Sequence, residues 1–201
     1  MSRINDLARW IQGLSASDAR QHAEAAQELF RAGAALCEAP LRQFYADPEL
    51  RSLLCMRAAE PTRPRHEAAV IVVGIAVVPE DFEQIRLANG SPPLADVPPD
   101  QDAREFELHF ENHAALDILT TRDTEGSGAI ARYLRKFGAG IQQVEIYVRN
   151  VDRATEILRS RFGLEPIYPA TRPGAGGMRV NFFLAPTAAG QKVLVELVEA
   201  S

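Results

Sequence analysis

The chain has 201 residues, of which 24% are charged, and its formal net charge is −5 at neutral pH. This length suits one compact domain with an appendage, and the acidic balance with dispersed lysine and arginine argues against a nucleic-acid partner. No apolar run approaches membrane-spanning length, and the first residues lack the apolar centre of a secretion signal. Cys37 and Cys55 show no metal-ligand or disulfide spacing, so we expect reduced thiols in a cytoplasmic protein.

The N-terminal third of the chain predicts a helical extension. Apolar residues recur at helical spacing over residues 4–14 and 19–36. Pro40 and Pro48 each suit a first helical turn, which predicts two further short helices. Residues 58–65 contain two prolines and are typical of a linker. We expect these helices to pack on the outer surface of a sheet or on a second subunit.

The rest of the chain repeats one pattern of secondary structure. Strands rich in β-branched residues are predicted at 70–77 and 141–148, and an acidic helix start follows each of them. Each copy then returns through extended segments, so the predicted unit is β-α-β-β-β, present twice. The second strand of the first copy should be short or irregular, because residues 92–102 are rich in proline and aspartate. A helix at 126–138, ended by glycine, links the copies. The returning strands are predicted at 105–110, 114–121, 179–184 and 192–199.

A carboxylate occupies the same place in the last strand of each copy. Asp117 and Glu196 are both flanked by aliphatic residues. Because side chains alternate across a strand, both acids point away from the apolar face. Two strands related by the repeat could therefore aim both acids at one cavity.

Other polar residues of the predicted strands have two interpretations each. Alternation over residues 106–110 sets Glu107 and His109 on one face, where His109 either does acid–base chemistry or faces solvent. Arg104 and Arg179 either stabilise negative charge or are solvated. The glycine run at 173–177 lies between extended segments, so it is no phosphate-binding loop; it is either a mobile flap or a plain hairpin connection.

Four stretches carry a family resemblance: SGAIARYL at 127–134, GAGIQQV at 138–144, RPGAGGMRV at 172–180 and VLVEL at 193–197. They resemble the second half of methylmalonyl-CoA epimerases, which belong to the vicinal oxygen chelate superfamily with glyoxalase I and extradiol dioxygenases. The resemblance is close over residues 113–199, weaker over 68–112 and absent from the N-terminal helices.

This resemblance implies an α+β fold in which two βαβββ modules form a cup-shaped mixed sheet, preceded by the helical extension. The extension and linker would occupy residues 1–65, and a glyoxalase-like domain would occupy residues 66–201. Within that domain, module one covers 68–122, the linking helix 125–138 and module two 139–200.

In the family the cup holds a divalent metal through one side chain from each of four strands. Carried over by motif, the four positions here are Val72, Asp117, Gln143 and Glu196, so both family histidines are absent. Zinc, nickel and cobalt favour imidazole or thiolate, whereas the oxygens of Asp117, Gln143 and Glu196 suit magnesium, calcium or manganese. Alternatively, these three residues form a hydrogen-bonded polar floor without a metal. The cofactor is therefore open between a divalent metal and none.

The resemblance also implies an epimerase, another isomerase or a lyase that acts on a small carbonyl compound or a CoA thioester. In the family the glutamate matching Glu196 is both ligand and base. The partner acid comes from the third strand of the first module, where Glu107 is the nearest match and Glu105 the alternative. The alternative function is a metal-free, non-catalytic module that binds a small ligand or mediates oligomerisation. We expect a homodimer with a small-molecule ligand and no membrane partner. The candidate substrate-binding residues are Arg179, Gly176 and Tyr147.

Overall fold

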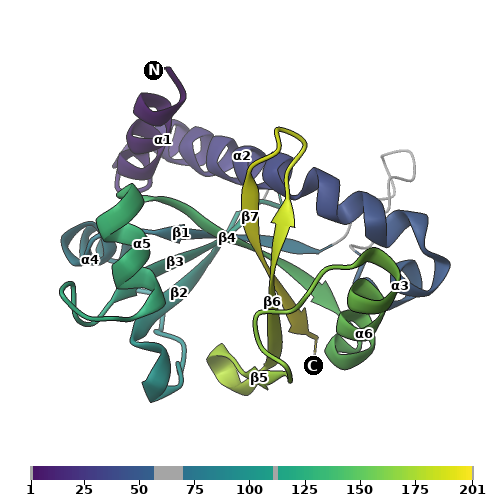
Figure 1. Cartoon of the computed structure of the whole chain (residues 1–201). Coiled ribbons are helices and arrows are strands. Elements are labelled where there is room, and N and C mark those ends of the chain that lie inside the picture. The colour runs from purple at the N-terminus through teal and green to yellow at the C-terminus, as the bar shows by residue number, and fades with distance from the viewer. Residues whose placement is uncertain (1, 57–69, 111–112, 201) are drawn as a thin grey trace. The chain divides into compact units, whose positions relative to one another are not determined.

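The computed structural model describes residues 2–56, 70–110 and 113–200 (Figure 1). Its strands form one seven-stranded sheet in the order β2-β3-β1-β4-β7-β6-β5. The sheet is mixed, because β1 runs parallel to β3 whereas the pairs β2–β3, β5–β6 and β6–β7 are antiparallel. The predicted α+β class with a mixed sheet is confirmed. The strands are β1 (Ile71–Ala76), β2 (Ala103–His109), β3 (Ala115–Thr121), β4 (Gly140–Val148), β5 (Arg172–Pro173), β6 (Arg179–Pro186) and β7 (Lys192–Glu199).

Six α-helices and two short 3-10 turns accompany the sheet in the described part of the chain. None of these described helices is long and apolar enough to cross a membrane. The predicted linker at 58–65 lies outside the described residues. The helices are α1 (Ser2–Gly13), α2 (Ala19–Ala46), α3 (Pro48–Leu53), α4 (Pro79–Ala88), α5 (Ala129–Phe137) and α6 (Val151–Phe162), and the turns are η1 (Pro99–Gln101) and η2 (Ala175–Gly177).

The helical extension is present as α1, α2 and α3, but one expected helix start is wrong. Pro40 lies inside α2 and does not begin a new helix. Proline lacks an N–H, so it removes the helical hydrogen bond to the carbonyl of Leu36. The buried side chains of Cys37 and Phe44, before and after Pro40, continue the apolar stripe of the helix. Burial therefore overrides the local preference of proline for a first turn.

The returning strands lie where the sequence predicts them. The segments predicted at 105–110 and 114–121 are β2 and β3, and those predicted at 179–184 and 192–199 are β6 and β7. Between α4 and β2 the chain forms η1 and no strand. The prolines of residues 92–99 explain this, because they cannot donate to a strand ladder. The first copy is therefore a reduced version of the second.

The chain folds into two compact units. Unit one contains residues 1–35, 72–143 and 175–177, and unit two contains residues 36–71, 144–174 and 178–201. Both α2 and β4 pass from one unit into the other. The predicted division at residue 65 stays a prediction.

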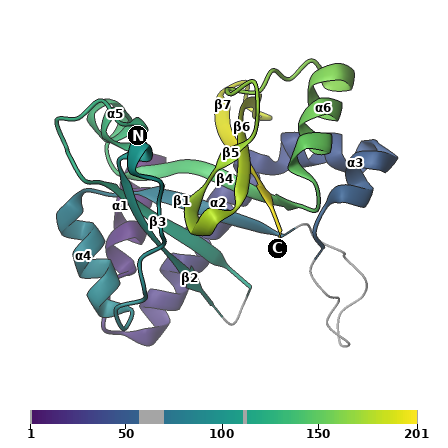
Figure 2. The ribbon, with the colours of Figure 1, turned by 90° about the horizontal axis from the view of Figure 1, so that it is seen from below.

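In unit one, helices cover the face of the sheet that carries Val73 and Ile75 of β1. Figure 2 shows α1 and α4 beside each other on these strands. The amide of Asn89, at the end of α4, donates a hydrogen bond to the carbonyl of Leu14 at 3.0 Å. The expected packing of the extension on a sheet surface is confirmed for α1 and the first half of α2. The members of this core from the helices and from the turn after α1 are Ile11 of α1, Leu14 just after it, Ala26 and Leu29 of α2, and Phe82 and Ile85 of α4.

Gly33 lets α2 approach β1 closely. A Cβ atom at this position would lie 2.4 and 2.5 Å from the two methyl groups of Val73. The branched side chain of Val73 is stiff and cannot turn away. Only glycine fits at this helix–strand contact.

The opposite face of β1 and β3 ends in a smaller apolar core. Ala76 and Leu119 pack there with Ile130 of α5 and with Val97 and Ala103. By strand alternation, Gly74 and Asp117 lie on this same face, two residues earlier on β1 and β3.

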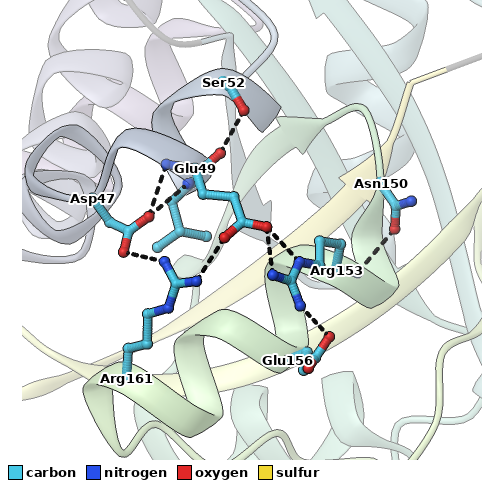
Figure 3. Close-up of polar contacts among 8 residues, drawn as sticks. Asp47, Glu49, Ser52, Asn150, Arg153, Glu156 and Arg161 are labelled. Carbon is cyan, nitrogen blue, oxygen red and sulfur yellow. Dashed lines mark hydrogen bonds and ion pairs between the residues drawn. The ribbon is translucent and has the colours of Figure 1, made fainter.

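In unit two, α3 and α6 are joined by ion pairs (Figure 3). The guanidinium of Arg161 lies 2.7 Å from the carboxylate of Asp47 and 2.6 Å from that of Glu49. Arg153 donates from Nε to Glu49 at 2.6 Å. Asp47 also accepts two backbone N–H bonds at the start of α3, and Asn150 accepts one at the start of α6. The caps thus hold the starts of α3 and α6, and the ion pairs join the start of α3 to both ends of α6.

Candidate functional site

Within unit one, strand register places polar side chains in one row. The parallel pairing of β1 and β3 sets Gly74 opposite Asp117, and the antiparallel pairing of β2 and β3 sets Glu107 opposite Asp117. Directly opposed residues project from the same face of a sheet. Asp117 is buried, while Glu107 is exposed. The row therefore runs from a covered carboxylate to a carboxylate in contact with water.

Gln143 of β4 reaches this row through Gly74. A Cβ atom on Gly74 would lie 2.5 Å from Cγ and 3.4 Å from Cδ of Gln143. The side chain of Gln143 therefore occupies the space above Gly74, and it is only 7% exposed. Sequence reasoning missed this role of Gly74, although a glycine inside a strand often marks a close approach.

Asp117 owes its orientation to the apolar residues on either side of it. Leu116 and Ile118 are fully buried in the core under the helices. Because successive side chains alternate, the intervening carboxylate must point to the other face. The alternation predicted from sequence for β3 is confirmed.

Glu105 lies two residues before Glu107 on the same face of β2. It stands opposite Leu119 and beside Ala103, which belong to the smaller apolar core. Burial, with a further contribution from the charge of Glu107, raises the pKa of Glu105 to about 7. A carboxyl group that titrates near neutral pH can both accept and donate a proton, as acid–base catalysis requires.

Glu107 and His109 share a face of β2, as their alternation predicts. The Nε2 atom of His109 lies 2.8 Å from a carboxylate oxygen of Glu107. Arg104 lies on the other face, where it contacts Glu83 at 2.6 Å and stacks over the ring of Phe82. Its contacts match the solvated surface role and not charge stabilisation beside Glu107.

Glu196 lies on β7, in unit two. It is 8% exposed and pairs across the ladder with Phe182 of β6. As in β3, its neighbours Val195 and Leu197 are buried. The expected convergence of Glu196 with Asp117 and Gln143 stays a prediction.

The three candidate substrate-binding residues have defined surroundings. In unit two, Arg179 pairs with Asp152 and, at 3.1 Å, with Glu199. The backbone of Tyr147 donates to the carbonyl of Val70 at 3.1 Å. In unit one, Gly176 adopts a φ of 61° and donates its N–H to the carbonyl of Asp96 at 3.0 Å. The roles of Arg179, Tyr147 and Gly176 in substrate binding stay predictions.

Comparison with known proteins gives the family. No protein-family model and no curated protein matches the chain, but solved structures do. The methylmalonyl-CoA epimerase from Mycobacterium tuberculosis is 34% identical, over 65% of this chain and 86% of that chain, with a TM-score of 0.53. The chain belongs to the vicinal oxygen chelate superfamily.

Two further solved structures are similar in fold. A hypothetical protein from Bacillus halodurans C-125 is 25% identical over 65% of this chain and 92% of that chain, with a TM-score of 0.53. A Streptomyces coelicolor methylmalonyl-CoA epimerase in complex with 2-nitronate-propionyl-CoA is 24% identical, over 65% of this chain and 95% of that chain, with a TM-score of 0.52. At this identity the second match shows the fold alone.

The donor set of this superfamily member does not fit the divalent metal that the resemblance implies. Val72 is 3% exposed and has no atom that could bind an ion. The candidate metal ligands that remain in unit one are the carboxylate of Asp117 and the carboxamide of Gln143. Across the described ranges, no three His, Cys, Asp or Glu side chains cluster so that they could hold a metal ion. Neither position of this face that matches a family histidine holds an imidazole, the ligand that zinc, nickel and cobalt favour.

Proposed function

We propose that this protein catalyses proton transfer at the carbon next to a carbonyl, as an epimerase-type isomerase acting on a CoA thioester. The observation that carries the proposal is the row of carboxyl groups on one face of β2 and β3: Glu105, Glu107 and Asp117. The neighbouring structures described as methylmalonyl-CoA epimerases supply the substrate class.

The proposed reaction consists of two proton transfers. A carboxylate removes the proton from the carbon next to the thioester carbonyl, and the electron pair of the C–H bond forms an enolate. An acid on the opposite side then returns a proton to the same carbon, which inverts its configuration. We assign these roles to Glu107 and Glu196, the acids that the family resemblance implies.

Glu105 is a second titratable carboxyl group near Glu107, two residues earlier on the same face of β2. Burial and then the negative charge of Glu107 oppose ionisation of Glu105, so Glu105 keeps its proton up to a higher pH. At neutral pH both forms of Glu105 are populated. A proton that moves between Glu105 and Glu107 leaves the net charge of the two residues together unchanged.

The test is isotope exchange. Native protein is incubated with methylmalonyl-CoA in deuterium oxide, and deuterium at the carbon between the two carbonyls is followed by mass spectrometry. Glu107→Gln and Glu196→Gln should each lower the exchange rate by about 10²- to 10⁴-fold, the usual size of an acid–base contribution. The matched control is Glu165→Gln, a change at an exposed loop residue, which should exchange at the native rate.

A second candidate function is favoured by the apolar Val72 and the amide Gln143 at the family's ligand positions. The protein would then be a non-catalytic module that binds a small ligand, in the predicted homodimer. In that case propionyl-CoA would raise the melting temperature of the native protein, while no deuterium would enter methylmalonyl-CoA. Exchange at the native rate in both glutamine variants would contradict the catalytic assignment itself.

A further inference from the structure

Gly74 and Gln143 are fitted to each other. A side chain of any size on Gly74 would collide with Gln143, because its Cβ would lie 2.5 Å from Cγ of Gln143 and 3.0 Å from Cδ1 of Leu119. Protein Cβ atoms do not approach other heavy atoms this closely. The side chain of Gln143 of β4 thus fills the space that a side chain on Gly74 of β1 would need.

The fitted pair lies at the β4 end of the polar row. Gly74 is opposite Asp117, so the side chain of Gln143 covers the position next to the buried carboxylate. Val72 precedes Gly74 by two residues and shares its face. It adds a buried apolar group there. This end of the row therefore combines one carboxylate, one carboxamide and aliphatic surface.

The face formed by Val72, Gly74, Asp117 and Gln143 is called the ion-free floor below. We infer that this face binds its ligand without a divalent ion, and that the carboxamide of Gln143 binds the ligand oxygen that an ion would otherwise hold. A carboxamide stays neutral at all accessible pH values and offers two N–H donors and one acceptor oxygen. Its N–H can donate to a thioester carbonyl and strengthen that bond as the oxygen gains negative charge. The ligand named here rests on the proposed function, whereas the absence of ion binding does not.

Cobalt uptake tests the ion-free floor. Native protein, purified without chelator, is titrated with cobalt(II), and the visible absorption and melting temperature are recorded. We expect no absorption band and no thermal shift. The double variant Val72→His with Gln143→His places two imidazoles beside Asp117 and should gain both signals, because imidazole is a good cobalt ligand.

Two results would overturn the ion-free floor. The first is stoichiometric cobalt, manganese or magnesium in the native protein that Gln143→Met removes. The second is a cobalt absorption band and a thermal shift in the native protein itself, whatever the double variant does. The native titration decides the matter even if the double variant fails to fold.

Propionyl-CoA binding tests the role of the carboxamide. Gln143→Met keeps the length of the side chain and removes its donors, so affinity measured by calorimetry should fall about 10-fold, as for one lost hydrogen bond. Unchanged affinity would overturn this role. Native protein that binds no propionyl-CoA would count against the proposed function, while the cobalt titration would still decide the ion-free floor.

Discussion

At the scale of single residues, two glutamates of one strand differ because of what lies across from them. Glu105 faces Leu119 and the smaller apolar core, whereas Glu107 faces Asp117 and contacts His109. The pKa of Glu105 is therefore raised to about 7, whereas the carboxylate of Glu107 is exposed to water. Cross-strand neighbours, and not residue type, decide this difference.

The raised pKa of Glu105 makes the stability of the protein depend on pH. Between the ordinary pKa of a glutamate and about 7, the folded state keeps the proton that the unfolded state has lost. Stability of the native protein should therefore fall as pH rises through this window and then level off. Glu105→Gln removes this titration, so its stability relative to native should be higher by roughly 2 kcal/mol at about pH 8 than at about pH 5.

Urea unfolding of both proteins at the two pH values measures this difference. Glu165→Gln is the matched control, and its stability relative to native should change little between the two pH values. An equal offset of Glu105→Gln at both pH values would contradict the raised pKa.

At the scale of elements, polar contacts tie α3 to α6 in unit two. Glu49 lies between Arg153 and Arg161, and hydrogen bonds from these two arginines hold its pKa below the usual range. Glu156 contacts Arg153 within α6 only. Glu49 therefore links α3 to α6, whereas Glu156 makes a contact within α6 alone. Three charges in a network hold their geometry better than one exposed pair.

Glu49→Ala should lower the melting temperature by a few degrees near neutral pH, because each of the two arginines loses one of its carboxylate partners. The loss should shrink in about 1 M salt, which screens exposed charges. It should also shrink as the pH falls through the lowered pKa of Glu49, because the native protein then loses the same ion pairs. Glu156→Ala is the matched control and should have a smaller effect. Equal effects of the two variants, independent of salt, would contradict a role for the network.

At the scale of the whole molecule, the two cysteines report on opening of the fold. Cys37 of α2 is fully buried, and burial raises the pKa of its thiol to about 12. Cys55 is half-buried, and its pKa is raised as well, chiefly by burial. Because the thiolate is the reactive form, both thiols should react more slowly than a free cysteine.

In native protein, Cys37 should react with a thiol reagent only when the fold opens, so its rate should rise with urea along the unfolding curve. Cys55 should react first and depend weakly on urea. Reaction kinetics of Cys37→Ala and Cys55→Ala, each with one thiol left, assign the two phases. Equal rates for both thiols in the native protein would contradict the burial of Cys37.

The sequence by itself determined the strands and the alternation of their side chains. Runs of β-branched residues locate β1 and β4, and aliphatic neighbours on both sides of Asp117 and Glu196 direct these acids away from the core. This works because backbone geometry links residue order directly to the face of a strand. The reduced first copy was predictable as well, since prolines at 92–99 cannot join a ladder.

Only the tertiary structure decided which residues meet. It carried α2 through Pro40, because buried residues on both sides outweigh one lost hydrogen bond. It set Glu105 against Leu119, which raises the pKa of the carboxyl group. It also folded Gln143 over Gly74. These outcomes depend on strand register and on the distance between segments far apart in the chain, and residue order along one segment contains neither.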